Sequence, residues 1–412
     1  MPTMKPPENQ ADRAVALVCG AFYPQYGGPG IAFLRLAPRL TEEGLRLTVL
    51  SRRAPGVVRR EEKSCLTILR FGGARSRRLN ELRFIAGVLW HLAVHSRRYH
   101  CIHVFSSGWV IFLVPLLGRL LGKRTSFTMT LLDSDDPENI GKTNQAWLKL
   151  RLYRLYDPVI YINPEQARRY EGVYGTTEPL IAGSMGIDME TFRPPTPRER
   201  LAARKELDLE EGALVAAFSG SLRHRKGIDR AVEVWLKIAE ARPDARFVIL
   251  GPQRDDVRVA DSLYPALMER IKASGKERNF RFLWSRPDIK MVLRLLHAAD
   301  LFLFPSRTEG TPSAVMEAMA CGVVPVVTPL DGFTGVVVRD EVEGLVLDPG
   351  AGMDDWAGRV LRLLEARDRL QRLATRSRKR VMETHSQEIA LEALKRAWGL
   401  SSSTGEEKGA AR

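Results

Sequence analysis

The chain opens with a short apolar run, a glycine-bearing loop and an amphipathic stretch. Ala14–Cys19 predicts a strand, Gly20–Gly30 (GAFYPQYGGPG) a loop, and Ile31–Glu43 a helix. This order is how a βαβ unit of a parallel sheet begins. Helical spacing of apolar residues predicts a second helix over Leu79–Ser96. Other apolar runs predict the strands Leu45–Leu50, Cys101–Phe105 and Thr125–Thr130.

The same pattern starts again in the second half of the chain. Val215–Phe218 predicts a strand, Gly220–Gly227 a glycine-flanked basic loop, and Ile228–Ala241 an amphipathic helix. Further predicted strands are Arg246–Leu250, Phe280–Leu283, Leu301–Phe304 and Val323–Val327. We therefore predict an α/β protein with two doubly wound, Rossmann-like parallel sheets. Ligands bind beyond the carboxyl ends of such strands, so both glycine loops are predicted to face a central cleft.

Proline density and polarity predict the domain borders. The segment Phe192–Pro197 (FRPPTP) disfavours a helix and marks the join. We predict an N-terminal domain over residues 1–190 and a C-terminal domain over residues 191–380. The helical stretch Met382–Trp398 belongs to a segment, 381–400, that is predicted to pack back toward the N-terminal domain. The small polar residues 401–412 are predicted to form a disordered tail.

The charge balance points to an anionic partner. The net charge is +14 and the isoelectric point about 9.8, which suits nucleotide phosphates or an anionic membrane surface. A solvated, arginine-rich surface is the alternative. Aromatic residues are not interleaved with the basic runs, so no nucleic-acid partner is predicted. Many of the basic residues lie in the N-terminal half, at Arg52, Arg53, Arg59, Arg60, Arg75, Arg77, Arg78, Arg97 and Arg98.

Cysteine spacing and apolar run length bear on the compartment. No pair of the four cysteines forms a Cys-x-x-Cys motif, and each lies within or beside an apolar run, so we predict reduced core thiols. Residues 1–12 lack the apolar region of a signal peptide. The run Trp109–Leu121 is too short to span a bilayer and predicts a buried helix. We expect a cytoplasmic protein that makes, at most, peripheral membrane contact.

The segment Pro305–Pro325 (PSRTEGTPSAVMEAMACGVVP) carries the most chemical information. It follows an apolar strand and places Glu309 on a loop, eight residues before Glu317 in or near the first turn of a helix. The free N–H groups of that helix suit a diphosphate. Small residues let a ligand approach the backbone at Gly310, Thr311, Pro312 and Ser313. An ordinary strand–loop–helix with surface carboxylates is the alternative.

Two further loops offer groups for a phosphate. In Phe218–Ile228 (FSGSLRHRKGI), the cations of Arg223, Arg225 and Lys226 lie at the start of a helix, although a solvated basic turn would look the same. In Phe22–Gly30 (FYPQYGGPG), adjacent glycines can cradle a phosphate through backbone N–H groups. Glycine turns are common, so this second signal is weak by itself.

These motifs together resemble the family-4 retaining glycosyltransferases (glycosyltransferase group 1), which have the GT-B fold. Pro305–Pro325 is similar to the family's E-x7-E signature, and Phe218–Ile228 to its G-R-L-x-x-x-K-G loop. Phe22–Gly30 is similar to the N-terminal F-x-P-x-x-G-G loop, with Gly27 and Gly28 as the match. Ile181–Pro194 is similar to the segment I-P-N-G-V-D-x-x-x-F-x-P, although Met185 replaces its asparagine.

The resemblance implies a role for each matching residue. Glu317 would hold the nucleotide ribose and Glu309 the transferred sugar, while Lys226 would grip the diphosphate. The family's arginine position is Ser221 here, so Arg223 or Arg225 would supply that charge. The base would lie near Leu283–Arg286, beside Trp284. We therefore predict Glu309, Lys226 and Arg223 as catalytic, and as donor-binding Gly27, Gly28, Ser221, Arg225, Trp284, Gly310, Thr311, Pro312, Ser313 and Glu317.

The chain also departs from the family. Gly335, in Asp331–Gly335, replaces a glutamate, and the segment Met129–Pro137 (MTLLDSDDP) lacks a histidine that many members have. Asp133 and Asp135 are predicted to bind acceptor hydroxyls, although the acids there, Asp136 included, could equally cap the next helix. His103 is predicted to be a satisfied core histidine. No metal site and no cofactor is predicted.

We therefore expect a metal-independent glycosyltransferase with a nucleotide-diphosphate sugar as donor and a glycan or lipid-linked acceptor. The N-terminal domain would bind the acceptor and the C-terminal domain the donor. Synthesis of cell-envelope glycans or polysaccharides and contact with an anionic membrane would fit the basic N-terminal half. The alternatives are a non-catalytic nucleotide-sugar-binding protein and another GT-B enzyme, such as a sugar-nucleotide epimerase. A phosphorylase is disfavoured because no pyridoxal-phosphate lysine site is recognisable.

Overall fold

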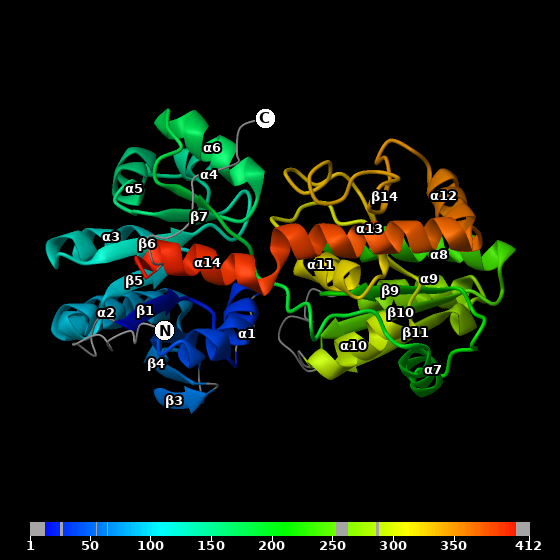
Figure 1. Ribbon diagram of the computed structural model, residues 1–412, viewed down its shortest axis with the longest axis horizontal. Helices are drawn as coiled ribbons and strands as arrows, with labels where there is room; N and C mark the ends of the chain where they lie inside the picture. Colours follow the sequence, from blue (N-terminus) through cyan, green and yellow to red (C-terminus); the bar gives the residue numbers. More distant parts are fainter. Residues whose placement is uncertain are drawn as a thin grey trace, which may run out of the picture. The chain divides into compact units, whose positions relative to one another are not determined.

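The computed structural model describes residues 13–24, 28–54, 56–63, 65–252, 263–285 and 288–400 (Figure 1). Predictions for Gly27, for Arg286 and for the tail 401–412 fall outside these residues. The chain forms two compact units. Unit 1 takes the chain up to Ile162, then Gln166–Gly186 and the residues from Glu388 onward; unit 2 takes Asn163–Glu165 and Ile187–Gln387.

Unit 1 is built on a sheet with the strand order β3-β4-β2-β1-β5-β6-β7-β8. All neighbours are parallel except β3 and β4, which are antiparallel. The strands are β1 (Ala14–Cys19), β2 (Arg46–Arg53), β3 (Arg60–Lys63), β4 (Leu66–Gly72), β5 (Cys101–Val104), β6 (Arg124–Thr128), β7 (Val159–Tyr161) and β8 (Leu180–Ala182). The chain crosses to the other side of β1 after β4, so the order reverses between β1 and β5.

Two separate cores lie on either side of this sheet. Val15 and Leu17 of β1 pack in one core with α1 and α14, and Ala16 and Val18 pack in the other with α2 and α3. This alternation follows from the two-residue period of a strand. The helices are α1 (Gly28–Glu42), α2 (Arg77–His95), α3 (Val110–Leu120), α4 (Pro137–Gly141), α5 (Ala146–Tyr153), α6 (Pro164–Tyr174) and α14 (Gln387–Trp398).

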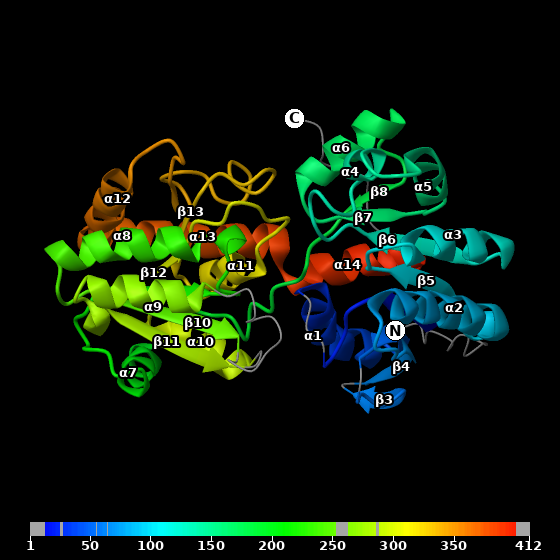
Figure 2. The same cartoon turned by 180° about the vertical axis from the view of Figure 1, so that it is seen from behind.

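Unit 2 is built on a parallel sheet with the order β11-β10-β9-β12-β13-β14 and has one continuous core. Its strands are β9 (Val215–Ser219), β10 (Arg246–Pro252), β11 (Phe280–Ser285), β12 (Leu301–Phe304), β13 (Val324–Val327) and β14 (Leu345–Val346). The helices α8 and α9 lie over one face of the sheet (Figure 2). The helices are α7 (Pro197–Glu206), α8 (Ile228–Ala241), α9 (Tyr264–Ala273), α10 (Ile289–Ala298), α11 (Ser313–Ala320), α12 (Met353–Glu365) and α13 (Arg367–His385).

Three local predictions were wrong. Helix α1 begins at Gly28, inside the predicted loop, because the last residues of that loop form its first turn. The predicted helix Met382–Trp398 is interrupted at Ser386, where the extended backbone forms a β-bridge with Ile187 that separates α13 from α14. Cys65 is exposed with φ +64°, unlike the buried Cys19, Cys101 and Cys321.

The buried His103 generates a prediction about pH. Its Nδ1 lies 2.8 Å from Ser126 Oγ and its Nε2 lies 3.0 Å from Thr128 Oγ1, so it is the satisfied core histidine that was predicted. Burial lowers the pKa of His103 from 6.5 to about 3. The unfolded chain therefore takes up a proton at a higher pH than the folded chain does. The stability that neutral His103 contributes is complete above the pKa of His103 in the unfolded chain. It is lost as the pH falls from that value toward the pKa of His103 in the folded chain.

We expect His103 to contribute a loss of about 2 kcal/mol in the free energy of unfolding between about pH 7 and about pH 5. Urea titrations of the wild type and of His103→Gln at both pH values measure this contribution. The variant should be less stable at neutral pH, yet its stability should fall less on acidification. The same pH dependence in both proteins would contradict the assignment.

Candidate functional site

The order of the strands in unit 2 brings two predicted loops together. Strands β9 and β12 are neighbours, and the chain leaves β9 toward β10 on one side and β12 toward β13 on the other. At such a switch point the two loops diverge and leave a crevice in which ligands bind. The loop after β9 carries Lys226, and the loop after β12 carries Glu309.

Three donors converge on one oxygen of Glu309. Lys226 Nζ lies 2.7 Å, Arg225 Nη1 2.9 Å and Ser306 Oγ 3.0 Å from Glu309 Oε1. Only 7% of the Glu309 side chain is exposed, so these charge-assisted bonds compensate for the loss of hydration. All three of these contacts are to Oε1, and no described residue has a hydrogen bond or ion pair with Glu309 Oε2.

Lys226 is held in a low-polarity setting. Its side chain is 19% exposed, and Nζ lies 5.3 Å from the centroid of the Phe304 ring. Burial lowers the pKa of Lys226, and the neighbouring carboxylate of Glu309 partly opposes that effect. A buried ammonium beside an aromatic ring is poorly hydrated, so it interacts strongly with an anion that enters the site.

Backbone contacts fix the two loops against each other. Gly227 has φ +70°, and a Cβ atom there would lie 1.8 Å from the carbonyl oxygen of Pro305. The Arg225 carbonyl accepts a hydrogen bond from Arg307 N at 2.8 Å, and it also lies 2.8 Å from Ser306 Oγ, whose single proton it shares with Glu309 Oε1. The Arg307 guanidinium in turn pairs with Asp229 in α8, at 2.7 Å and 2.9 Å. The positions of both cations beside Glu309 thus depend on the backbone as well as on charge.

The helix that follows Glu309 begins with a residue that cannot cap it. Pro312 is the N-cap of α11 and has no side-chain acceptor for the first N–H groups of the helix. An uncapped helix N-terminus attracts anions. Glu317 is buried in the second turn of α11, one turn beyond the N-terminus. The pKa of the Cys321 thiol is raised mainly by burial and, to a smaller extent, by the negative charge of Glu317.

The remaining predicted donor residues are distributed over both units. Arg225 contacts Glu309 directly, whereas Arg223 donates its backbone N–H to the carbonyl of Ser221 at 2.9 Å. Trp284 is the next-to-last residue of strand β11, with its ring centroid 4.8 Å from that of Tyr264. Gly28 is exposed in the first turn of α1, in unit 1. These assignments remain predictions.

Sequence reasoning missed Asn163 as part of this site. Its Nδ2 donates to the carbonyl oxygens of Gly310 at 2.7 Å and Asp331 at 2.9 Å, and its Oδ1 accepts from Glu165 N at 2.9 Å. Gly332, with φ +67°, lies so close that a Cβ atom would be 1.8 Å from Asn163 Oδ1. Asn163 therefore ties the loop after Glu309 to the loop after β13. Asn163 lies two residues after the short strand β7, and no local sequence pattern marks it as a site residue.

The predicted acceptor residues of unit 1 have local structural partners. Asp135 is buried and accepts from Thr130 N at 2.8 Å, Thr130 Oγ1 at 2.7 Å and Leu131 N at 3.1 Å. Burial raises the pKa of Asp135 to about 6. Asp136 caps α4 by accepting from Asn139 N at 3.0 Å, which is the capping alternative.

Asp133 is the more accessible of the two predicted acceptor residues. Its carboxylate is 58% exposed and lies 2.7 Å from Arg169 Nη1. Its backbone has φ +62°, a left-handed conformation that aspartate tolerates better than most residues. Of the two, Asp133 is therefore the one whose oxygens face solvent, and the acceptor role remains a prediction.

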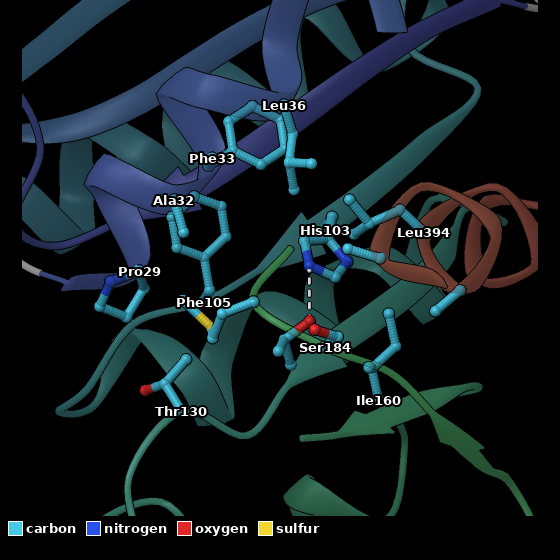
Figure 3. A pocket seen from close by; sticks show the side chains of 14 residues that line it. Pro29, Ala32, Phe33, Leu36, His103, Phe105, Thr130, Ile160, Ser184 and Leu394 are labelled. Carbon is cyan, nitrogen blue, oxygen red and sulfur yellow. Dashed lines mark hydrogen bonds between the residues drawn. The ribbon is translucent and has the colours of Figure 1, made fainter. Parts of the chain in front are cut away.

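Unit 1 contains a small cavity of about 40 Å³ between α1, the ends of the central strands and α14. Phe33 and Leu36 of α1 face His103 and Leu394 across it (Figure 3). The lining is mainly apolar, with a few hydroxyl groups such as that of Thr130. None of the residues predicted to bind the donor or the acceptor lines this cavity, so it is a separate feature of the fold.

Neither a metal centre nor a membrane span is apparent in the part of the chain that the structure describes. No group of three or more His, Cys, Asp or Glu side chains is arranged there to hold a metal ion. No described helix is long and apolar enough to cross a bilayer.

Comparison with known proteins gives matches over both halves of the chain. The family described as "Glycosyl transferases group 1" matches residues 199–380, and "Glycosyl transferase 4-like domain" matches residues 27–181. A GDP-mannose-dependent monoacylated alpha-(1-6)-phosphatidylinositol monomannoside mannosyltransferase of Corynebacterium glutamicum is 30% identical over 245 residues, which cover 58% of this chain and 61% of that protein.

A second curated relative is similar in extent. A D-inositol 3-phosphate glycosyltransferase of Segniliparus rotundus is 27% identical over 299 residues, covering 70% of this chain and 64% of that protein. The chain therefore spans less than two thirds of the length of these two relatives.

Two solved structures share the fold. Sucrose-phosphate synthase from Thermosynechococcus elongatus has a TM-score of 0.72 at 19% identity, covering 94% of this chain and 99% of that chain. HepE from Anabaena in complex with UDP-glucose has a TM-score of 0.72 at 15% identity, covering 94% of this chain and 100% of the HepE chain. At these identities the likeness establishes the fold alone.

The close approach of Gly227 to Pro305 generates a matched pair of variants. Gly227→Ala should force the two loops apart and lower the free energy of unfolding by about 3 kcal/mol or more, because the new methyl group overlaps a backbone oxygen. Gly175→Ala is the control, since Gly175 has a similar φ of +69° but no described atom within 4 Å of the added Cβ.

The control Gly175→Ala should lower the free energy of unfolding by only about 1–2 kcal/mol, which is the strain of an alanine in the left-handed conformation. Thermal and urea unfolding of both variants measure the difference. Equal losses of stability would show that the loops can separate without cost.

Proposed function

Since the chain belongs to the group 1 glycosyltransferases and has the GT-B fold, we propose that it transfers a sugar from a nucleotide-diphosphate sugar to an acceptor hydroxyl. The transfer would retain the anomeric configuration and would need no metal ion. One observation carries this proposal: Lys226 and Arg225 meet at Glu309 in the crevice between β9 and β12.

The cations match the charge that transfer creates. When the bond between the sugar and the diphosphate breaks, negative charge develops on the departing phosphate oxygen. Lys226 is fixed and poorly hydrated, so it can stabilise that charge without rearrangement. Arg225 is more exposed and can turn from Glu309 toward the second phosphate. The fixed Lys226, the more exposed Arg225 and the N-terminus of α11 would then perform the task of a divalent metal.

Glu309 would orient the sugar rather than attack it. Its Oε1 is engaged by two cations and Ser306, which makes this oxygen a weak nucleophile. Its Oε2 can accept a hydrogen bond from a sugar hydroxyl. The acceptor hydroxyl would enter on the face that the diphosphate leaves, and the departing phosphate oxygen would take its proton. Glu317 would accept hydrogen bonds from the ribose hydroxyls.

The names of the relatives suggest which substrates to test first. One curated relative is named as GDP-mannose-dependent, another is named a D-inositol 3-phosphate glycosyltransferase, and HepE was solved with UDP-glucose. We therefore propose GDP-mannose and UDP-glucose as the first donors to test. A phosphorylated polyol or a lipid-linked glycan of the cell envelope is the proposed acceptor class.

The thiols support a reducing compartment for this activity. Cys19, Cys101 and Cys321 are free and buried, and burial raises the pKa of each to about 12. A thiol with so high a pKa is almost entirely protonated near neutral pH and therefore unreactive. Reduced core thiols of this kind are typical of cytoplasmic proteins, and we propose that location.

The decisive experiment screens donors with and without the candidate residues. The purified protein is tested, in the presence of EDTA, for thermal stabilisation by UDP, GDP and ADP. It is also tested for release of the nucleoside diphosphate from the corresponding nucleotide sugars. Lys226→Ala should lower turnover by about 10²–10³-fold, the effect of removing one preorganised electrostatic contact. Glu309→Gln should also lower turnover, because it leaves two cations without their carboxylate.

Lys379→Ala is the matched control, because Lys379 is a 71% exposed lysine of unit 2 on α13. It should turn over like the wild type. Normal turnover by Lys226→Ala would remove that residue from the mechanism. Donor binding without turnover would favour a non-catalytic binding protein, and conversion of the donor sugar without an acceptor would favour an epimerase.

A further inference from the structure

The outward side of α2 is apolar, which is unusual for a helix at the surface of a protein. Exposed fractions are 43% for Leu79, 65% for Leu82, 62% for Trp90 and 59% for Val94. The opposite side of the helix packs in the core of unit 1 through residues such as Phe84. A helix that is apolar all round is normally covered on every side. Every other exposed position between Arg77 and Arg98 is alanine or arginine.

The neighbouring helix α3 continues this surface. The two helices lie side by side in both views of the fold (Figures 1 and 2). On α3 the exposed residues are Leu116 at 38%, Leu120 at 76% and the basic Arg119. We call the exposed residues of these two helices the α2–α3 face. Unit 2 offers no comparable patch among its described residues, where the exposed large apolar side chains are Leu201 and Met382.

The charge around the α2–α3 face is predominantly positive, with Glu81 and Asp157 as the acids beside it. No aspartate or glutamate occurs between Glu81 and Asp133, and Glu81 is itself paired with Arg52 at 2.6 Å. The same stretch contains Arg83, Arg97, Arg98, Arg119, Lys123 and Arg124. A hollow of about 350 Å³ at the end of α3 is lined by Arg119, Lys123, Arg124, Thr125, Leu155 and Asp157. The hollow can hold an anionic headgroup beside the exposed Leu120.

We infer that the α2–α3 face docks on the surface of an anionic lipid bilayer. The apolar side chains would enter the boundary between headgroups and acyl chains, and the arginines at the ends of α2 would meet lipid phosphates. Apolar side chains flanked by arginines complement such a surface, because Glu81, the acid on α2, is already paired with Arg52. A protein partner would have to bury several unpaired arginines, so a lipid surface is the better match. This inference does not depend on the identity of the donor.

Binding to vesicles tests the inference independently of activity. The full chain is sedimented with vesicles of phosphatidylcholine alone and with vesicles containing one third phosphatidylglycerol. We expect binding to the anionic vesicles that weakens with added salt. Leu82→Ser with Trp90→Ser, and separately Arg97→Gln with Arg98→Gln, should each weaken binding by about tenfold or more. All four side chains are exposed, so circular dichroism should show unchanged folding.

Arg372→Gln with Arg376→Gln is the matched control, because it removes two exposed arginines from α13 in unit 2. It should bind vesicles like the wild type. Equal weakening by this control would show attraction by net charge alone and would overturn the docking face. Failure of the wild type to bind anionic vesicles at low salt would also overturn it. So would a wild-type dimer that Leu82→Ser with Trp90→Ser converts to a monomer, since a second copy would then cover the face.

Discussion

The site in unit 2 depends on the contact between Gly227 and the carbonyl oxygen of Pro305. Strands β9 and β12 bring the two loops near each other, but only a residue without a Cβ atom allows their backbones to touch. That contact brings Lys226 within 2.7 Å of Glu309. A longer distance between the two loops would leave the ammonium of Lys226 and the carboxylate of Glu309 buried without their partners. That loss would lower the free energy of unfolding by several kcal/mol. Backbone packing therefore makes the ion pair possible.

Much of this arrangement could be predicted from the sequence, because strong apolar runs mark the central strands. The predicted limits of β1 and β12 agree with the structure, and those of β9 and β10 differ only at their ends. Strands β3, β4, β7, β8 and β14 were not predicted. Strands β3 and β8 lie at the two edges of the unit 1 sheet. Strand β3 has the polar sequence Arg-Glu-Glu-Lys, and β8 has only three residues. Edge strands need less apolar surface, so their hydrophobic signal is weak.

The predictions for the site failed where the structure depends on long-range contacts. Asn163 forms hydrogen bonds with the carbonyl oxygens of Gly310 and Asp331, which lie far along the chain. No local sequence pattern predicts these contacts. Ser386 interrupts the last helical stretch because Ile187 pairs with the backbone beside it. At Ser386 helix propensity gave the wrong expectation, and at Asn163 it gave none, since a partner distant in sequence decided each contact.

Ser221 stands where the motif that this loop resembles has an arginine. The proposed diphosphate would need a second cation at that place in space, and a different backbone position can deliver one there. Arg225 is four residues further on, yet its carbonyl is fixed by Ser306 and Arg307, so its guanidinium is directed at Glu309. Arg307 is in turn held by Asp229. The cation beside Lys226 is thus positioned by the loop after β12, which also carries Glu309, and the two charges are placed as a unit.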